Sequence, residues 1–92
     1  MSASAAATLT IVNELGLHAR AATMLARLAA GYASELYLAK DGREVNGKSI
    51  MSVLLLTATK GSRVDVRAVG EDSEALIAAV ARLVEAKFGE PA

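Results

Sequence analysis

The strictest constraint on the fold is an alternating pattern in the second half of the chain, over residues 62–69. There the sequence reads SRVDVRAV, in which the apolar residues Val64, Val66 and Ala68 alternate with charged ones. Strict alternation predicts a β-strand with one buried face and one face in water. Antiparallel sheets are commonly covered on one side only, so the pattern favours such a sheet.

Three further segments have strand character. Residues 8–13 form a short β-branched run, TLTIVN, and residues 35–40 alternate as ELYLAK. Residues 43–46, REVN, follow Asp41-Gly42, a pair typical of two-residue hairpin turns. We therefore expect 35–40 and 43–46 to form a hairpin.

Two segments have helical periodicity. From about Ala19, apolar residues recur at helical spacing as far as Gly31, which is expected to end the helix. A last helix is expected to begin at Asp72 or Ser73, which would cap it, and to run to about Phe88. Each helix has apolar residues spaced to form one face. They are Leu25, Leu28, Ala29 and Tyr32 in the first helix, and Leu76, Val80, Leu83 and Val84 in the last.

The segment 49–59, SIMSVLLLTAT, is ambiguous, because periodicity does not separate a buried strand from a short helix. Ser49 before an apolar run is typical of an N-cap and favours the helix, which makes the order β-α-β-β-α-β-α. The apolar residues are too many for one face, so Met51 and Leu54 are expected to be exposed. An exposed apolar patch often marks a partner surface, although a loosely covered edge of the core would look the same.

The length of 92 residues fits one domain, expected over residues 8–90 after a disordered lead over 1–7. The formal net charge is zero, which argues against a nucleic-acid binder. The start lacks the features of a secretory signal, and no apolar run is long enough to span a bilayer. The chain has no cysteine, which excludes disulfides and thiolate metal sites. We expect a soluble cytoplasmic protein without membrane insertion.

The single histidine, His18, lies where a strand pattern ends and a helix pattern begins. Free backbone N–H groups and the positive dipole end at a helix start favour an anion site, and Arg20 adds a guanidinium suited to phosphate oxygens. Nearby positive charge disfavours the imidazolium and leaves a ring nitrogen free as a nucleophile. This combination suits phosphoryl transfer, which depends mostly on positioning and charge stabilisation.

Other interpretations of His18 are less favoured by the pattern. One histidine, no cysteine and no nearby carboxylate pattern fit a metal site poorly. Nothing in the sequence resembles the nucleophile elbow of a Ser-His-Asp hydrolase. A lone histidine in a loop is more commonly a surface or capping residue, and that alternative stays open from position alone.

Two motifs resemble the histidine-containing phosphocarriers (HPr) of the bacterial phosphotransferase system. GLHAR at residues 16–20 is similar to that family's active-site signature, and GKSIMSV at 47–53 is similar to its regulatory-serine region. The element order agrees over roughly residues 7–90. The resemblance implies an α+β open-faced β-sandwich, with a four-stranded antiparallel sheet and three helices on one face.

The resemblance also implies roles for particular residues. His18 would accept a phosphoryl group on Nδ1, Arg20 would stabilise that group, and Ser49 would match a serine that an HPr serine kinase phosphorylates in some bacteria. The donor would be enzyme I, which draws on phosphoenolpyruvate, and the acceptor a sugar-specific component. The protein would be a monomeric phosphorylated intermediate without cofactor, metal or turnover of its own. The expected partner-binding residues are Leu17, Lys48, Ile50, Met51 and Leu54.

One departure and several alternatives remain. The family usually has proline directly after the arginine, where this chain has Ala21. Alanine is a good helix former and adds one N–H near the phosphate, so the nucleophile is kept but the phosphohistidine lifetime is open. A regulatory carrier of the same family without sugar transport, and a module that binds an anion without being phosphorylated, are the alternative functions. Ser49 is either a cap alone or both a cap and a kinase site.

Overall fold

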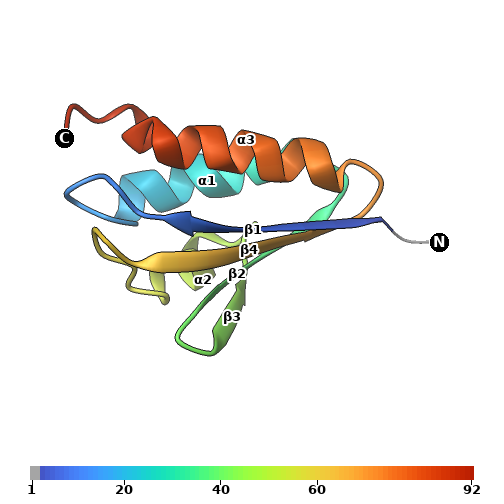
Figure 1. Ribbon diagram of the computed structural model, residues 1–92, viewed down its shortest axis with the longest axis horizontal. Helices are drawn as coiled ribbons and strands as arrows, with labels where there is room; N and C mark the ends of the chain where they lie inside the picture. The colour runs from blue at the N-terminus through green and yellow to red at the C-terminus, as the bar shows by residue number, and fades with distance from the viewer. Residues whose placement is uncertain (1–2) are drawn as a thin grey trace.

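The structure is a computed structural model that describes residues 3–92 (Figure 1). Within these residues the element order is the predicted β-α-β-β-α-β-α, followed by one turn of 3-10 helix, η1. The elements are β1 (Ser4–Thr10), α1 (Ala19–Ala30), β2 (Glu35–Lys40), β3 (Arg43–Asn46), α2 (Ile50–Leu54), β4 (Arg63–Val69), α3 (Ser73–Glu85) and η1 (Lys87–Gly89).

The sheet is antiparallel throughout, and its strand order is β1-β4-β2-β3. Leu9 pairs with Val64 and Leu38 with Val66, so the inward-facing residues of three strands meet around β4. Val64, Val66 and Ala68 are buried, whereas the charged residues between them are exposed. The alternation therefore predicts this inner strand and its two faces correctly.

The helices form one layer over one face of the sheet. Figure 1 shows α1 and α3 above the same face, and α2 packs against α1 and β3. The core lies between these layers, where Leu25 of α1, Leu36 of β2 and Leu76 of α3 are fully buried, and Val53 of α2 and Phe88 of η1 join them. The opposite face of the sheet is open, so the predicted open-faced sandwich of the α+β class is confirmed.

The first strand differs from the prediction. β1 covers Ser4–Thr10, whereas the sequence predicts a strand over 8–13 and a disordered lead over 1–7. The lead is wrong for residues 4–7, because backbone pairing with β4 runs from Thr10 opposite Arg63 to Ser4 opposite Val69. Alanine has a low strand propensity, so this run carries little local signal. Ala3 is bonded as well, since its carbonyl accepts from the N–H of Gly70 at 2.8 Å, and residues 1 and 2 of the predicted lead lie outside the described part of the chain.

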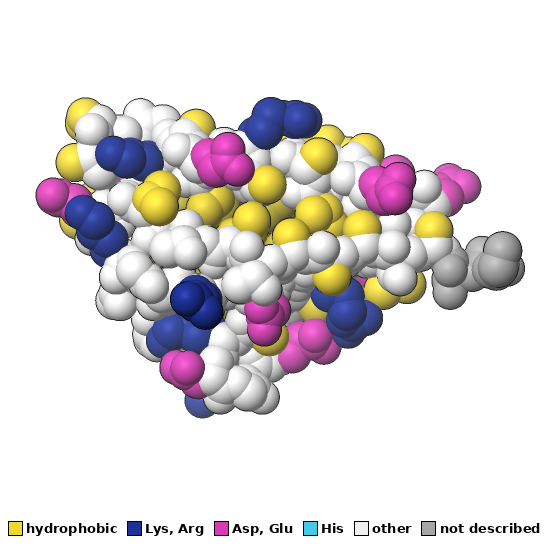
Figure 2. All heavy atoms as spheres, in the orientation of Figure 1, with side chains coloured by type: hydrophobic (Ala, Val, Ile, Leu, Met, Phe, Trp, Pro, Cys, Tyr) yellow, Lys and Arg dark blue, Asp and Glu magenta, His cyan; other side chains and the backbone are white. Residues whose placement is uncertain are grey.

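Charged side chains are mixed on the molecular surface. On the face shown in Figure 2, basic and acidic side chains are interspersed over helices and strands alike. This distribution agrees with the formal net charge of zero. Within residues 3–92, no helix is both long enough and apolar enough to cross a bilayer.

Asp72 stands at the N-cap position of α3, but its side chain does not cap that helix. Its carboxylate accepts hydrogen bonds from the backbone N–H groups of Ala33 and Ser34, each at 2.8 Å, and from the Ser34 hydroxyl. These bonds, the Ser34 hydroxyl foremost, hold the pKa of Asp72 below its usual value. The predicted cap is thus a bridge that joins the start of α3 to the segment entering β2.

The bridge predicts a specific pH dependence of stability. A carboxyl whose pKa is lower in the folded state stabilises the protein above its ordinary pKa of about 3.9, and this contribution is lost as the pH falls through the folded value. Asp72→Asn should therefore lose less unfolding free energy than the wild type as the pH drops below about 4. Urea denaturation across this pH range measures the difference. Glu71→Gln removes the same charge from an exposed neighbour and should behave like the wild type. If Asp72→Asn loses as much unfolding free energy on acidification as the wild type does, the bridge is contradicted.

Candidate functional site

His18 occupies the N-cap position of α1, with extended backbone angles (φ −74°, ψ 178°). The preceding loop is tied to residues 58–59, because the N–H of Leu17 donates to the carbonyl of Ala58 at 2.9 Å. Gly16 has φ +66°, and a Cβ there would lie 2.9 Å from the Cα of Thr59. Glycine is therefore required for the close approach that sets the loop, and through it the position of His18.

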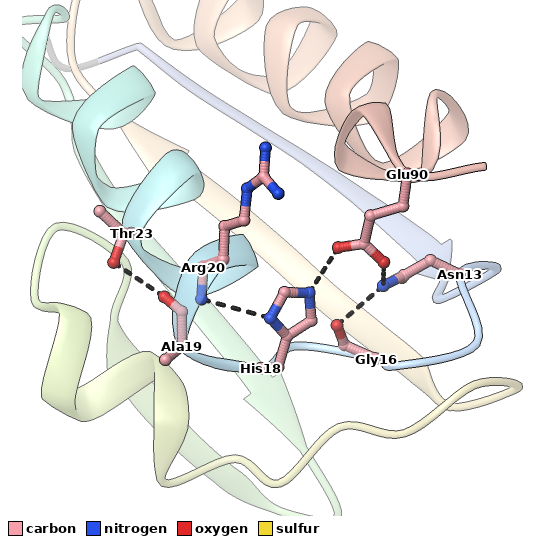
Figure 3. A network of polar contacts seen from close by, with 7 residues as sticks. All are labelled: Asn13, Gly16, His18, Ala19, Arg20, Thr23 and Glu90. Atoms are coloured by element: carbon pink, nitrogen blue, oxygen red, sulfur yellow. Dashed lines mark hydrogen bonds and ion pairs between the residues drawn. The ribbon is translucent and has the colours of Figure 1, made fainter. Parts of the chain in front are cut away.

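Both ring nitrogens of His18 have partners (Figure 3). Nδ1 accepts a hydrogen bond from the backbone N–H of Arg20 at 3.3 Å, which makes the imidazole the side-chain cap of α1. Nε2 contacts the carboxylate Oε2 of Glu90. The pKa of Glu90 lies below its usual range, mainly because of the hydrogen bond from His18 and secondly because of the one from Asn13. An ionised carboxylate only accepts, so Nε2 carries the ring proton and Nδ1 keeps its lone pair.

The first turn of α1 supplies positive charge beside Nδ1. The N–H of Ala22 donates to the carbonyl of His18 at 2.8 Å and makes the first hydrogen bond within the helix. The N–H groups that precede Ala22 have no carbonyl partner within the helix, as at every helix start. Arg20 is exposed, and its guanidinium extends from the same turn without a hydrogen-bond partner in the part of the chain that the structure describes. Ala21 is fully buried, which shows that a small side chain fits against the core there. The arrangement favours an anionic group beside Nδ1.

Glu90 was not predicted as a site residue. The sequence assigns the neighbouring Gly89 and Pro91 to the end of the last helix and gives Glu90 no role. Its carboxylate reaches His18 only because the chain after α3 returns to the loop before α1, 72 residues earlier. No local periodicity or short motif carries a signal for such a contact.

The exposed apolar residues near the site differ in part from the prediction. Met51 is 72% exposed, as expected, whereas Leu54 is half-buried against the core, so its predicted exposure is wrong. Leu55 is exposed instead, at 59%, because positions four apart share one face of a helical turn. Ile50 is also exposed.

In the loop before His18, too, the exposed leucine is a different one from the leucine that was predicted. Leu17, one of the residues expected to contact partners, is 5% exposed and belongs to the core, so its side chain offers a partner little surface. Leu15, two residues earlier, is 70% exposed. We call Leu15, Ile50, Met51 and Leu55 the apolar rim. Figure 3 shows α2, which carries part of this rim, beside the first turn of α1.

Lys48 and Ser49 lie at the start of α2. The Ser49 hydroxyl accepts a hydrogen bond from the N–H of Ser52 at 3.3 Å, so the predicted N-cap is confirmed. The ammonium of Lys48 donates to the carbonyl of Tyr32 at 2.9 Å. Lys48 thus joins α2 to the C-terminal end of α1, where carbonyl groups favour a cation.

The described residues contain no group of three or more His, Cys, Asp or Glu side chains placed to hold a metal ion. One hollow in this part of the chain lies on the sheet, between β1, β4 and the β2–β3 hairpin, and includes Ala6, Thr8, Ala39 and Arg67. It contains none of the residues around His18. The His18 side chain is 27% exposed, so the ring is half-buried and open to a partner at the surface.

Comparison with known proteins gives a consistent family. Residues 5–86 match the family described as "PTS HPr component phosphorylation site". The chain is 45% identical over 82 residues to the phosphocarrier protein HPr of Xylella fastidiosa strain Temecula1, covering 89% of this chain and 92% of that one. It is 42% identical over 81 residues to HPr of Cupriavidus necator, covering 88% and 91%. The crystal structure of HPr-C-His from Thermoanaerobacter tengcongensis superposes with a TM-score of 0.92 at 39% identity, covering 96% and 99%.

Proposed function

Because the chain belongs to the family of HPr phosphocarriers of the phosphotransferase system, we propose that it carries its phosphoryl group on Nδ1 of His18. Members of this family exchange the group with enzyme I and with sugar-specific components, and they are carriers without turnover of their own. The observation that carries the assignment is the lone pair of Nδ1 beside the start of α1, while Nε2 is engaged by Glu90.

The proposed reaction is a direct displacement at phosphorus. The Nδ1 lone pair attacks the phosphoryl group on enzyme I, and the bond from phosphorus to the donor breaks as the Nδ1–P bond forms. The guanidinium of Arg20 and the N–H groups at the start of α1 offset the charge of the phosphoryl oxygens. The same step in reverse transfers the group to a sugar-specific component. Incubation with enzyme I and phosphoenolpyruvate, followed by mapping of the modified residue, tests the assignment.

We propose that the apolar rim is the docking surface for these partners. Its residues lie on the loop before His18 and on α2, next to the start of α1. Met51 stands out because it is highly exposed and its flexible side chain adapts to different partner surfaces. Arg20 adds a cation beside the rim, which suits an acidic partner surface.

Met51→Asp is expected to weaken binding to enzyme I by about 1 kcal/mol or more, the scale of an interface residue that matters. Its thermal stability should stay close to that of the wild type, because the side chain is outside the core. Titration calorimetry with enzyme I gives the affinity. Thr10→Asp, which puts the same charge on the exposed side of β1, is the matched control. A large loss of stability with unchanged affinity would place Met51 in the core instead.

We further propose that Ser49 is a regulatory site for an HPr serine kinase, and that the protein acts as a monomer in the cytoplasm. The cap geometry supports the regulatory role of Ser49, because the negative charge of a phosphate at the start of a helix is favoured by the helix dipole. The absence of cysteine from the sequence fits a reducing compartment. Sedimentation velocity at cellular concentrations tests the oligomeric state.

A further inference from the structure

Both oxygens of the Glu90 carboxylate accept hydrogen bonds, one from the His18 ring and one from Asn13. Oε2 faces Nε2 of His18, and Oε1 accepts a hydrogen bond from Nδ2 of Asn13 at 3.0 Å (Figure 3). Asn13 is fully buried, and the same Nδ2 donates to the carbonyl of Gly16 at 2.9 Å. The carboxylate is therefore fixed from behind by a group that is itself fixed to the loop before His18.

The backbone that delivers Glu90 adopts a costly conformation. Lys87 and Phe88 have φ values of 56° and 54°, in the left-handed region that residues other than glycine rarely occupy. Such conformations persist only where the surrounding structure holds them, and they gather at functional sites. Phe88 is 1% exposed and anchors the turn, and the carbonyl of Ala92 accepts from the N–H of Glu14 at 3.1 Å. The tail over residues 87–92 is thus bound at two points on either side of Glu90.

We propose that Glu90 is a positioning residue for phosphoryl transfer, which keeps the ring proton of His18 on Nε2 and balances the positive charge that the ring gains when Nδ1 is phosphorylated. This inference rests on the proposed function of His18. A neutral ring with its proton on Nε2 presents its lone pair only at Nδ1. The carboxylate selects that form before the partner arrives, as an orienting carboxylate does for other nucleophilic or basic histidines.

The charge balance follows from the bonds that change. When the Nδ1–P bond forms and the donor–phosphorus bond breaks, no proton leaves the ring, so the ring becomes a cation with its proton still on Nε2. The Nε2–H···Glu90 hydrogen bond then joins a cation to an anion, the stronger class of hydrogen bond. When the phosphoryl group departs, the neutral ring returns with the same proton. The start of α1 faces Nδ1 through the backbone N–H of Arg20, and the carboxylate faces Nε2, so the two ring nitrogens meet opposite partial charges, as the transfer requires.

Glu90→Gln removes the charge and keeps a single accepting oxygen, which serves either Nε2 of His18 or Nδ2 of Asn13 but not both. The kcat for phosphorylation of the variant by enzyme I and phosphoenolpyruvate is expected to fall about tenfold, the scale for loss of such a supporting partner, with the KM for the carrier little changed. Glu85→Gln, at an exposed position on α3, makes the same chemical change as a control and should match the wild type. A wild-type kcat for Glu90→Gln would overturn the charge-balancing role.

The tautomer is measured without any phosphoryl transfer. Because His18 is the only histidine, the ¹⁵N chemical shifts of a histidine-labelled sample report on this ring alone. At alkaline pH the wild type should show the form protonated on Nε2, and Glu90→Ala should show a mixture. An unchanged tautomer in Glu90→Ala would overturn the positioning role. If wild-type His18 accepts no phosphoryl group, the proposed function fails and the kinetic role of Glu90 fails with it, whereas normal transfer by Glu90→Gln refutes the role of Glu90 alone.

Discussion

His18→Ala is expected to fold and to accept no phosphoryl group from enzyme I. His18 is the only histidine of the chain, so no second imidazole replaces the lost Nδ1. The ring is an N-cap outside the core, so its removal should cost about 1 kcal/mol of unfolding free energy, in the range for a lost cap. Radiolabelled phosphoenolpyruvate with enzyme I gives the measurement. The wild type should carry one phosphoryl group that is labile in acid and stable in alkali.

The matched control is His18→Asn. Asparagine is a preferred N-cap residue, so this variant should recover most of the stability lost in the alanine variant. It lacks a nucleophilic ring nitrogen and should still accept nothing. Phosphorylation of either variant by enzyme I would show that another residue carries the group, and it would refute the assignment of His18.

Ser49→Asp is expected to remain folded and to be phosphorylated on His18 at least about tenfold more slowly. A negative charge at the start of a helix is favourable, so α2 should tolerate it. The charge lies beside Met51 and Ile50 of the apolar rim, where it would meet an acidic partner surface or be buried against an apolar one. A phosphoserine would act more strongly, because it carries roughly 1.5 to 2 negative charges at neutral pH. Initial rates at low salt, where repulsion is least screened, give the comparison.

Two neutral variants separate the cap from the switch. Ser49→Ala removes the hydrogen bond to Ser52 and should cost about 0.5–2 kcal/mol of unfolding free energy, with little effect on the phosphorylation rate of the folded protein. Ser49→Asn should keep both the cap and the rate. Equal rates for Ser49→Asp and the wild type would leave Ser49 as a cap only.

Local patterns predict most of this fold. The hairpin illustrates why: Asp41 and Gly42 both adopt positive φ values, 52° and 80°, which the two-residue turn requires and which these residue types tolerate. The ends of β2, β3 and α1 lie within a residue of their predicted places, since caps and turns are set by neighbours in the chain. The first residues of β1 were not predicted as a strand, because a run of alanines has no alternation of apolar and polar side chains. That strand is specified by its pairing with β4.

In the candidate site, too, some features follow from the local sequence and others only from tertiary contacts. By itself, the sequence determined where the single imidazole stands, at the start of a helix with Arg20 in its first turn, because a helix N-terminus is a local property of the chain. Only the tertiary structure decided which nitrogen of His18 carries the proton and which keeps its lone pair, since Glu90 approaches Nε2 from the far end of the chain. The tertiary structure also decided that Leu15 and Leu55 are exposed while Leu17 and Leu54 turn inward. Burial of leucines on a loop and on a one-turn helix depends on what packs over them, and no pattern within such short segments contains that information.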